Sequence, residues 1–316
     1  MFEVNVKMKV VAASDPGNNR VCNEDSYVID VEKNLVVVGD GMGGHNAGRH
    51  ASQVAVAMFQ QCFNDLDADL IKQITQDVYE KKMFPVMRLI ACIRLAHRKV
   101  YNESLANRDF HGMGTTLTAV AVSNGSALIG HVGDGRVYRF RRGKMEQLTD
   151  DHTYVNELIV DKDIMPQDVK KFQDRNVITR ALGVDLGVKI DIRSEPLQAG
   201  DLLLICTDGL THALTEAEID RIVKYNRNNF DHAIKHLIDD ANMKDGSDNI
   251  TVALIHVQQL AHSLSGLPFY KQTIKFQGEA IIAIENKILK RMIKSEPFYQ
   301  KLRCNFLNLF NKSGKN

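Results

Sequence analysis

Apolar and polar positions in the first part of the chain predict strands followed by helices. Residues 2–13 alternate as a surface strand does, and residues 26–30 and 35–39 predict a pair of strands joined by a polar turn. Across residues 46–100 the apolar positions recur every three or four residues, which predicts a series of helices.

The second part of the chain repeats this order. Residues 114–148 predict a meander of four antiparallel strands, and the flap-like segment 150–178 is polar and irregular, as surface loops are. Further strands are expected at 190–193, 201–206 and 250–257, with two or three helices between 210 and 243. Because strands and helices come in separate clusters, the pattern favours an α+β fold with antiparallel sheets over alternating βαβ units.

Three apolar runs end in the dipeptide Asp-Gly. They are Asp40-Gly41, Asp134-Gly135 and Asp208-Gly209, and a fourth aspartate, Asp248, stands just before the last predicted strand. A single Asp-Gly pair usually marks only a turn. Aspartates gathered at strand ends can also form an oxygen cage for hard divalent cations such as Mg²⁺ or Mn²⁺. Such a cage suits metal-assisted hydrolysis of a phosphoester.

A glycine-rich loop lies between a predicted strand and a predicted helix at residues 41–48. Its G-x-G-x-x-G pattern fails at Asn46, and it has no Walker A lysine, which disfavours a dinucleotide or nucleotide site. Asp40 would also place a negative charge beside a pyrophosphate. We expect instead a tight turn that exposes the Gly41 carbonyl beside the Asp40 carboxylate.

Arg20 stands in a polar cluster that ends in Glu24 and Asp25. One interpretation is a surface ion pair with either acid. The other is a bidentate clamp on a phosphoryl group, which the planar guanidinium suits. The cluster by itself favours neither interpretation.

Charge and cysteine content narrow the partners and the compartment. The 316 residues carry a formal net charge of +1, but residues 259–316 hold 10 Lys and Arg against 3 Asp and Glu, which leaves −6 on residues 1–258. An acidic body argues against nucleic-acid binding, which needs a basic surface. The five cysteines are widely spaced, so neither a zinc site nor a disulfide framework is expected. Without a signal-peptide core or a membrane-length apolar run, we expect a cytoplasmic protein.

Residues 259–316 differ in pattern from residues 1–258, which we expect to form the catalytic domain. Apolar residues between 281 and 293 fall on one helical face and basic residues on the other, until Pro297 ends the helix. We therefore expect a basic amphipathic C-terminal extension. Such a helix packs on its own domain or on a protein partner, or lies on a membrane surface.

Together, these features resemble the metal-dependent protein phosphatases of the PPM family, the type 2C serine/threonine phosphatases, and in particular their bacterial branch. The matching blocks run in the family's order across residues 2–257, and so many ordered blocks make the resemblance specific. The blocks are Asp15-Pro16-Gly17 with Arg20 and Asn23-Glu24-Asp25, Gly39 to His45 with Ala47-Gly48, Met113 to Thr116, Gly130 to Arg136, Leu148 to His152, Asn176 to Gly183, Leu204 to Leu210 and Asp248 to Val252.

The resemblance implies a four-layer αββα sandwich of two antiparallel sheets flanked by helices, with a binuclear metal centre at one end. It implies that Asp40 bridges two Mn²⁺ or Mg²⁺ ions and that the Gly41 carbonyl binds one of them. Asp208 and Asp248 would complete the other. Asp134, together with Asp208, would hold a third, weaker ion.

The resemblance also implies a reaction, the hydrolysis of phosphoserine and phosphothreonine in proteins. Arg20, Asp40 and Asp208 would be the catalytic residues, with Arg20 binding the phosphate of the substrate. Glu24 and Asp25 would support the site mostly through water. A water or hydroxide between the two ions would attack phosphorus in line, without a phosphoenzyme.

Three positions qualify the resemblance. Met42 stands where eukaryotic relatives carry a His that protonates the leaving group, as in the bacterial branch, so a metal-bound water is the expected acid. Arg49 stands where many relatives carry Glu, which changes the charge near the helix start but removes no metal ligand. Because the reaction needs no cysteine nucleophile, Cys206 is expected to be a core residue.

Two other functions are compatible with parts of the pattern. A pseudophosphatase that binds a partner without catalysis would need a broken ligand set, whereas Asp40, Asp134, Asp208 and Asp248 are all present. A metallohydrolase of nucleotides or small phosphoesters is disfavoured by the acidic body and by the resemblance. The expected partners are therefore phosphorylated proteins, the substrates of a Ser/Thr kinase, and no nucleic acid.

Overall fold

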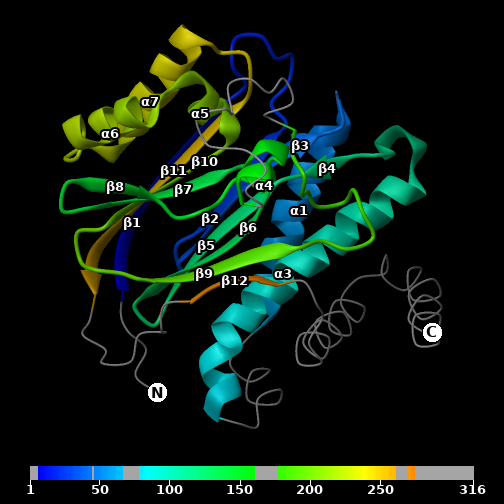
Figure 1. Ribbon diagram of the computed structural model, residues 1–316, viewed down its shortest axis with the longest axis horizontal. Coiled ribbons are helices and arrows are strands. Elements are labelled where there is room, and N and C mark those ends of the chain that lie inside the picture. Colours follow the sequence, from blue (N-terminus) through cyan, green and yellow to red (C-terminus); the bar gives the residue numbers. More distant parts are fainter. Residues whose placement is uncertain (1–5, 45, 67–77, 161–176, 261–269, 275–316) are drawn as a thin grey trace.

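The computed structural model arranges the chain in four layers, with two antiparallel sheets face to face and helices outside each sheet (Figure 1). This arrangement confirms the predicted α+β sandwich. The residues that the structure describes are 6–44, 46–66, 78–160, 177–260 and 270–274. The predicted helical part of the C-terminal extension, at residues 281–293, lies outside them.

The larger sheet has seven strands in the order β12-β9-β6-β5-β3-β2, with β4 paired to β3. The strands are β2 (Asp25–Asp30), β3 (Leu35–Met42), β4 (Gly114–Thr115), β5 (Leu117–Ser123), β6 (Ser126–Val132), β9 (Ile190–Pro196) and β12 (Tyr270–Ile274). Helices α1 (Asn46–Asp65) and α3 (Val78–Ala106) cover its outer face, and the short 3₁₀ helix η1 (Arg108–Phe110) follows α3.

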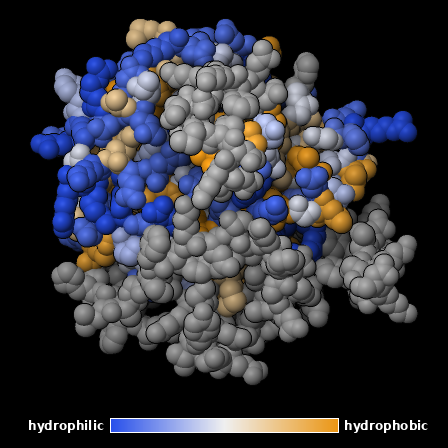
Figure 2. Space-filling view, in the orientation of Figure 1, coloured by the Kyte–Doolittle hydropathy of each residue, from blue (hydrophilic) through white to orange (hydrophobic). Residues whose placement is uncertain are grey.

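The smaller sheet has five strands in the order β1-β11-β10-β7-β8. The strands are β1 (Val6–Asp15), β7 (Arg136–Arg141), β8 (Lys144–Gln147), β10 (Leu202–Cys206) and β11 (Ile250–Leu260). Helices α5 (Asp208–Ala213), α6 (Glu216–Tyr225) and α7 (Phe230–Lys244) cover it, and their outward surface in Figure 2 is mainly hydrophilic. Among the described residues, no helix is long and apolar enough to cross a membrane.

The hydrophobic core forms three layers, one between the sheets and one under each group of helices. Strand β3 shows why its sequence is apolar at successive positions. Leu35 and Val37 face the helices α1 and α3, whereas Val36 and Val38 face the other sheet. Because both faces of this strand are buried, alternation would leave polar side chains in the core.

The predicted meander at residues 114–148 is divided between the two sheets. Strands β5 and β6 pair in the larger sheet, and β7 and β8 pair in the smaller one. The chain therefore changes sheets at Gly133-Asp134-Gly135. The prediction of one continuous meander was wrong, because local turn signals do not show which sheet a hairpin joins.

Two predicted boundaries fall in regions that the structure describes only in part. The flap begins with α4 (Tyr154–Val160), and residues 161–176 lie outside the description. The predicted domain boundary at residue 258 lies within β11. Strand β12, at residues 270–274, pairs with β9 and so adds a part of the predicted extension to the larger sheet.

Candidate metal centre

Five aspartates from separate parts of the chain gather where the two sheets meet. Asp25 and Asp40 lie opposite each other on β2 and β3. Asp208 begins α5 directly after β10, Asp248 precedes β11, and Asp134 lies in the turn between β6 and β7. Their charges act on one another, in addition to the effect of burial. The charges of Asp25, Asp208 and Asp134 raise the pKa of Asp40, and the charge of Asp248 raises the pKa of Asp208.

The glycines that follow two of these aspartates serve close backbone packing. A Cβ at Gly41 would lie 2.0 Å from the carbonyl oxygen of Gly48 in α1, and one at Gly209 would lie 2.1 Å from that of Asn249. Gly41 lies within β3, so the turn predicted there was wrong. The chain turns instead at Gly43 and Gly44, whose φ values are +135° and +76°. Any side chain at the position after these aspartates would push the packed elements apart, which explains why glycine follows aspartate there.

Asp25 is held by two threonine hydroxyl groups. Oγ1 of Thr207 and Oγ1 of Thr251 donate to its Oδ2 at 2.9 and 2.6 Å. Burial raises the pKa of Asp25 to about 7, although these two hydrogen bonds favour the carboxylate. The carboxyl is 7% exposed, so it is fixed in direction and costly to ionise without a cation nearby.

The other carboxyl groups also hold protons more tightly than isolated aspartates do. Burial raises the pKa of Asp40 well above its usual value, and the charge of Asp25 adds to this effect. Burial and the charge of Asp208 raise the pKa of Asp134 to about 8. Burial is the main cause that raises the pKa of Asp208, while the charge of His212 lowers it. Repulsion among buried carboxyl groups is the condition that a bound cation relieves.

The donor atoms fit a hard divalent cation. Within the described residues, one buried oxygen each of Asp25, Asp134 and Asp208 has no hydrogen-bond partner. Also within that part of the chain, no three His, Cys, Asp or Glu side chains form a closed metal-binding cluster. Mg²⁺ and Mn²⁺ accept oxygen ligands and keep several waters, so one or two carboxylates per ion, with a backbone carbonyl such as that of Gly41, are sufficient.

Arg20 lies beside this group of carboxylates. Its Nη2 lies 3.0 Å from the Asp248 carboxylate, and its Nε donates to the Ser247 carbonyl at 3.2 Å. The charges of Glu24 and Asp40 also act on it and favour its protonated form. The guanidinium is half exposed, so its remaining N–H groups are accessible from solvent. This partner differs from both acids that the sequence suggested, Glu24 and Asp25.

Glu24 takes part in the site through its backbone. Its N–H donates to the Asn249 side chain at 2.8 Å, and its carbonyl accepts the N–H of Gly41 at 3.2 Å and the hydroxyl of Ser52 at 2.5 Å. The glutamate thereby ties β3, α1 and the segment before β11 together. Its side chain is 9% exposed and lies against Gly48.

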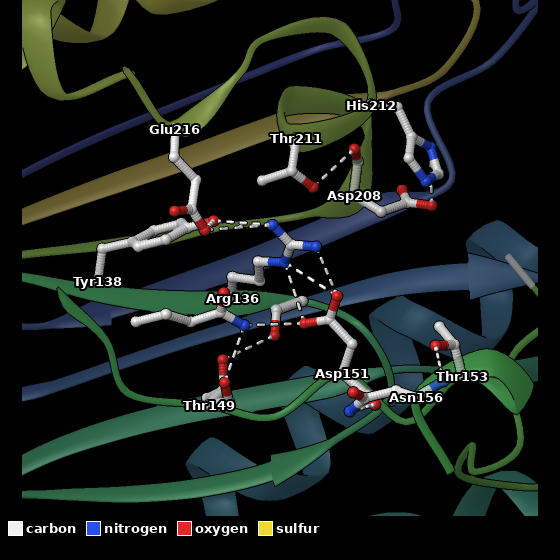
Figure 3. Close-up of polar contacts among 12 residues, drawn as sticks. Arg136, Tyr138, Thr149, Asp151, Thr153, Asn156, Asp208, Thr211, His212 and Glu216 are labelled. Carbon is white, nitrogen blue, oxygen red and sulfur yellow. Dashed lines mark hydrogen bonds and ion pairs between the residues drawn. The ribbon is translucent and has the colours of Figure 1, made fainter. Parts of the chain in front are cut away.

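The structure also shows side chains at this site that the sequence did not single out (Figure 3). Arg136 forms a two-pronged ion pair with Asp151, with contacts of 2.6 to 3.0 Å, and its Nη1 donates to the Tyr138 hydroxyl. Nδ1 of His212 lies 3.5 Å from Oδ2 of Asp208, one helical turn away on α5. Asp151 and Arg136 were in quoted sequence blocks, but spacing alone could not pair them.

Four further positions were named from the sequence. Met42 ends β3 and is half-buried, and Arg49 is exposed on α1. His45 lies outside the described residues. Cys206 is 1% exposed on β10, and burial raises the pKa of its thiol to about 12, as expected for a core residue and not for a nucleophile.

Comparison with known proteins gives a consistent result. The family pattern of Protein phosphatase 2C matches residues 17–245. The chain is 36% identical over 245 residues to the serine/threonine phosphatase stp of Listeria innocua, an alignment that covers 77% of this chain and 93% of that one. The solved serine/threonine phosphatase of S. agalactiae is 31% identical, with a TM-score of 0.70, and the match covers 80% of this chain and all of that one.

A second solved structure bears on the metal centre. The catalytic domain of the serine threonine protein phosphatase PstP, in complex with 2 manganese ions, is 29% identical to this chain with a TM-score of 0.65. The match covers 82% of this chain and 100% of that domain. The domain that holds these two manganese ions is therefore similar to this chain in fold.

Proposed function

The chain belongs to the protein phosphatase 2C family, whose members are metal-dependent serine/threonine phosphatases, and on that premise we propose how its own residues divide the reaction. Asp40 is the shared ligand of two Mn²⁺ or Mg²⁺ ions, and the Gly41 carbonyl is a ligand of one of them. Asp208 and Asp248 hold the other. Asp134, with Asp208, holds a third, weaker ion.

The position of Asp40 supports the role of shared ligand. Asp40 is central among the five aspartates, because the charges of Asp25, Asp208 and Asp134 all raise its pKa. Its backbone is also held firmly, because its N–H donates to the Thr116 hydroxyl at 3.0 Å and its carbonyl accepts the N–H of Thr116 at 2.8 Å. A carboxylate with a fixed backbone and several charged neighbours is suited to a position between two cations.

Arg20 and the acidic residues near it prepare the substrate's phosphate. Arg20 binds the phosphoryl oxygens through its exposed N–H groups, since a planar guanidinium matches them. Asp25 and Glu24 act at one remove, as carboxylates that accept hydrogen bonds from waters around the ions. When bound, the ions supply an activated water for attack on phosphorus and offset the charge of the phosphoryl group.

One observation carries this proposal above the others. Buried oxygens of Asp25, Asp134 and Asp208 lack a hydrogen-bond partner within the described residues. By contrast, the other carboxyl oxygen of Asp25 accepts hydrogen bonds from two threonine hydroxyl groups. Unpaired buried carboxylates are costly unless a ligand completes them. A protein that only bound a partner would have no reason to keep this cost.

The experiment is hydrolysis of a phosphothreonine peptide with and without Mn²⁺, beside the variant Asp208→Asn. We expect phosphate release that needs Mn²⁺ and that the variant lowers by at least about a hundredfold. Equal turnover by the variant, or turnover in the presence of a chelator, would contradict the assignment. A folded protein that binds the phosphopeptide without turnover would favour the pseudophosphatase.

The proposal extends to the partners of the protein and to its compartment. The substrates are phosphorylated proteins, and we propose that a Ser/Thr kinase produces them. Among the described residues, the cysteines at positions 22, 62, 92 and 206 form no disulfide bond, as is usual in a reducing compartment, which supports action in the cytoplasm. We propose that residues 259–316 bind a protein partner, on the basis of their basic amphipathic sequence.

A further inference from the structure

A buried histidine at the base of the flap holds the turn that carries Asp134. His152 is 2% exposed. Its backbone N–H donates to the carbonyl of Gly133 at 2.8 Å, and its ring Nδ1 accepts the Gly133 N–H at 3.0 Å. Both backbone polar groups of Gly133, the residue before Asp134, are therefore bound by one residue.

The same turn packs against Thr116, which precedes β5, and against Thr118 on β5. Gly133 has a φ of +115°, and a Cβ there would lie 2.5 Å from Cβ of Thr116. A Cβ at Gly135 would lie 2.9 Å from Oγ1 of Thr118. Since the backbone already touches β5, a displacement of the turn would either collide with these threonines or break its bonds to His152.

These bonds determine which ring nitrogen of His152 carries the proton. Nδ1 accepts an N–H, so it must offer a lone pair, and the proton of the neutral ring is then on Nε2. Nε2 lies 3.2 Å from Oδ2 of Asp191 on β9, and Oδ1 of Asp191 accepts from Arg180 at 3.0 Å. The contact lacks hydrogen-bond geometry, so Asp191 acts on Nε2 only through its nearby negative charge, which favours a proton there.

The base of the flap converges on the same residue. The His152 carbonyl accepts the N–H of Thr179 at 2.8 Å, and Thr153 forms a bridge with Ile178. The two ends of the flap are thus joined to each other next to His152. The ring of His131 on β6 lies against the His152 ring, with a centroid distance of 4.7 Å and a tilt of 36° between the ring planes.

We propose that His152 is a positioning residue for the reaction: as the Nε2–H tautomer, it fixes the Gly133 peptide through its two hydrogen bonds and so the direction in which Asp134 presents its carboxylate to a divalent cation. The inference rests on the proposed metal-binding role of Asp134. Asp134 is 5% exposed, and its Oδ1 has no hydrogen-bond partner in the described part of the chain. The backbone turn is therefore what aims this oxygen.

Two substitutions separate the functions of the ring nitrogens. His152→Asn places a side-chain oxygen near the position of Nδ1, so it can still accept the Gly133 N–H. His152→Gln places its polar end near Nε2 and leaves the Gly133 N–H unpaired. His97→Gln is the matched control, because His97 is also buried and its Nδ1 accepts the N–H of Gly183, at 3.1 Å, away from Asp134.

The readout is Mn²⁺ binding by the full chain, measured by equilibrium dialysis with detection of free Mn²⁺ by electron paramagnetic resonance. We expect His152→Gln to weaken the weakest Mn²⁺ site by roughly tenfold to a hundredfold, as the loss of an outer-shell partner does, and His152→Asn to weaken it by less than about threefold. His97→Gln should lower the melting temperature and leave all Mn²⁺ affinities unchanged.

The outcomes distinguish this inference from the proposed function. Wild-type Mn²⁺ affinities in His152→Gln, or an equal loss in His97→Gln, would overturn the positioning role alone. A wild-type chain that binds no Mn²⁺ would overturn the proposed function, and the positioning role with it.

A measurement on the unmodified protein applies even if His152→Gln does not fold. In the ¹⁵N-labelled full chain, the ring nitrogen shifts of His152 should show the Nε2–H tautomer at neutral pH. A scalar coupling across the hydrogen bond should link the Gly133 amide nitrogen to Nδ1 of His152. A proton on Nδ1, or the lack of this coupling, would overturn the proposal.

Discussion

Arg20 forms its ion pair with Asp248, which is 228 positions away, and not with the acidic residues that follow it in the sequence. The Arg20 Nη2 lies 3.0 Å from the Asp248 carboxylate, so the loop after β1 and the segment before β11 meet at the metal centre. A cation bound by Asp248 and a phosphate bound by Arg20 would be connected to each other through this ion pair. The pair therefore links the proposed substrate position to a proposed metal ligand.

Replacing Arg20 by Ala should weaken substrate binding. We expect kcat/KM on a phosphothreonine peptide to fall by roughly tenfold to a hundredfold, mostly through KM, because a charge-assisted hydrogen bond to the phosphate is lost. Steady-state kinetics would measure this. Arg49→Ala is the control, since Arg49 is also exposed and cationic. The same loss in Arg49→Ala would indicate a general effect of charge and contradict a specific role for Arg20.

Replacing Asp208 by Asn should have opposite effects on the metal-free and metal-loaded protein. Burial and the charge of Asp248 raise the pKa of Asp208, so the amide should stabilise the metal-free fold by about 1 kcal/mol. The stabilisation by Mn²⁺ should be lost. Melting curves with chelator and with Mn²⁺ test both parts.

The contrasting variant is Asp151→Asn. Asp151 pairs with Arg136, so its loss leaves a partly buried guanidinium without its carboxylate partner and should destabilise both forms by about 1–3 kcal/mol. If Asp208→Asn instead behaves like Asp151→Asn, the carboxylates at the centre are not in mutual repulsion.

The stability of the metal-free protein should fall as the pH rises through neutrality. The pKa of Asp25 is about 7 and that of Asp134 about 8, both above the usual value, so each group contributes stability that is complete below about pH 4 and is lost as the pH passes its folded-state pKa. Between about pH 6 and about pH 8 the loss should be on the order of 1–3 kcal/mol.

Bound Mn²⁺ should remove this pH dependence, because the carboxylates are then ionised and paired with a cation. Mn²⁺ binding near neutral pH should also release protons, which a weakly buffered titration would detect. A metal-free protein whose unfolding free energy is constant or rises over this interval would show that these carboxyl groups are already ionised.

His97 should make the fold sensitive to acid. Burial lowers the pKa of His97 to about 4, so its contribution is present above the unfolded-state pKa and is lost as the pH falls toward about 4. At about pH 5 the loss should be about 2 kcal/mol relative to neutral pH. Urea unfolding at both pH values, for the wild type and for His97→Gln, measures the difference, and an equal pH dependence in the two proteins would contradict it.

The position of β12 predicts where the chain can be shortened. Removing residues 275–316 leaves the described sheets complete and should spare activity on a small phosphoester such as p-nitrophenyl phosphate. Removing residues 259–316 also removes the end of β11 and all of β12, which exposes β9 as an edge strand. We expect a lower melting temperature and aggregation for the longer deletion, measured by scanning calorimetry and light scattering. Equal behaviour of the two would show that β12 adds no stability.

The strand clusters were accessible from the sequence because they rest on local signals, and the same signals drew attention to the candidate aspartates. A strand buried on both faces must be apolar at successive positions, as Leu35 to Val38 are, and Asp40 lies near the end of the same strand. The order of the quoted blocks then indicated the family. The pairing of Arg20 with Asp248 was not accessible, because no local pattern specifies a contact across 228 positions.

The meaning of the recurrent Asp-Gly pairs shows where local signals end. They predicted turns, yet Gly41 lies in a strand and its lack of a side chain serves the approach of α1. The sheet to which each half of the predicted meander belongs was also undetermined, since both halves form ordinary hairpins. Apart from β12, which was not predicted, the sequence by itself determined most of the strands and helices and which carboxylates are available. Only the tertiary structure decided which of them share a low-dielectric site, because burial and charge repulsion depend on groups brought together from distant parts of the chain.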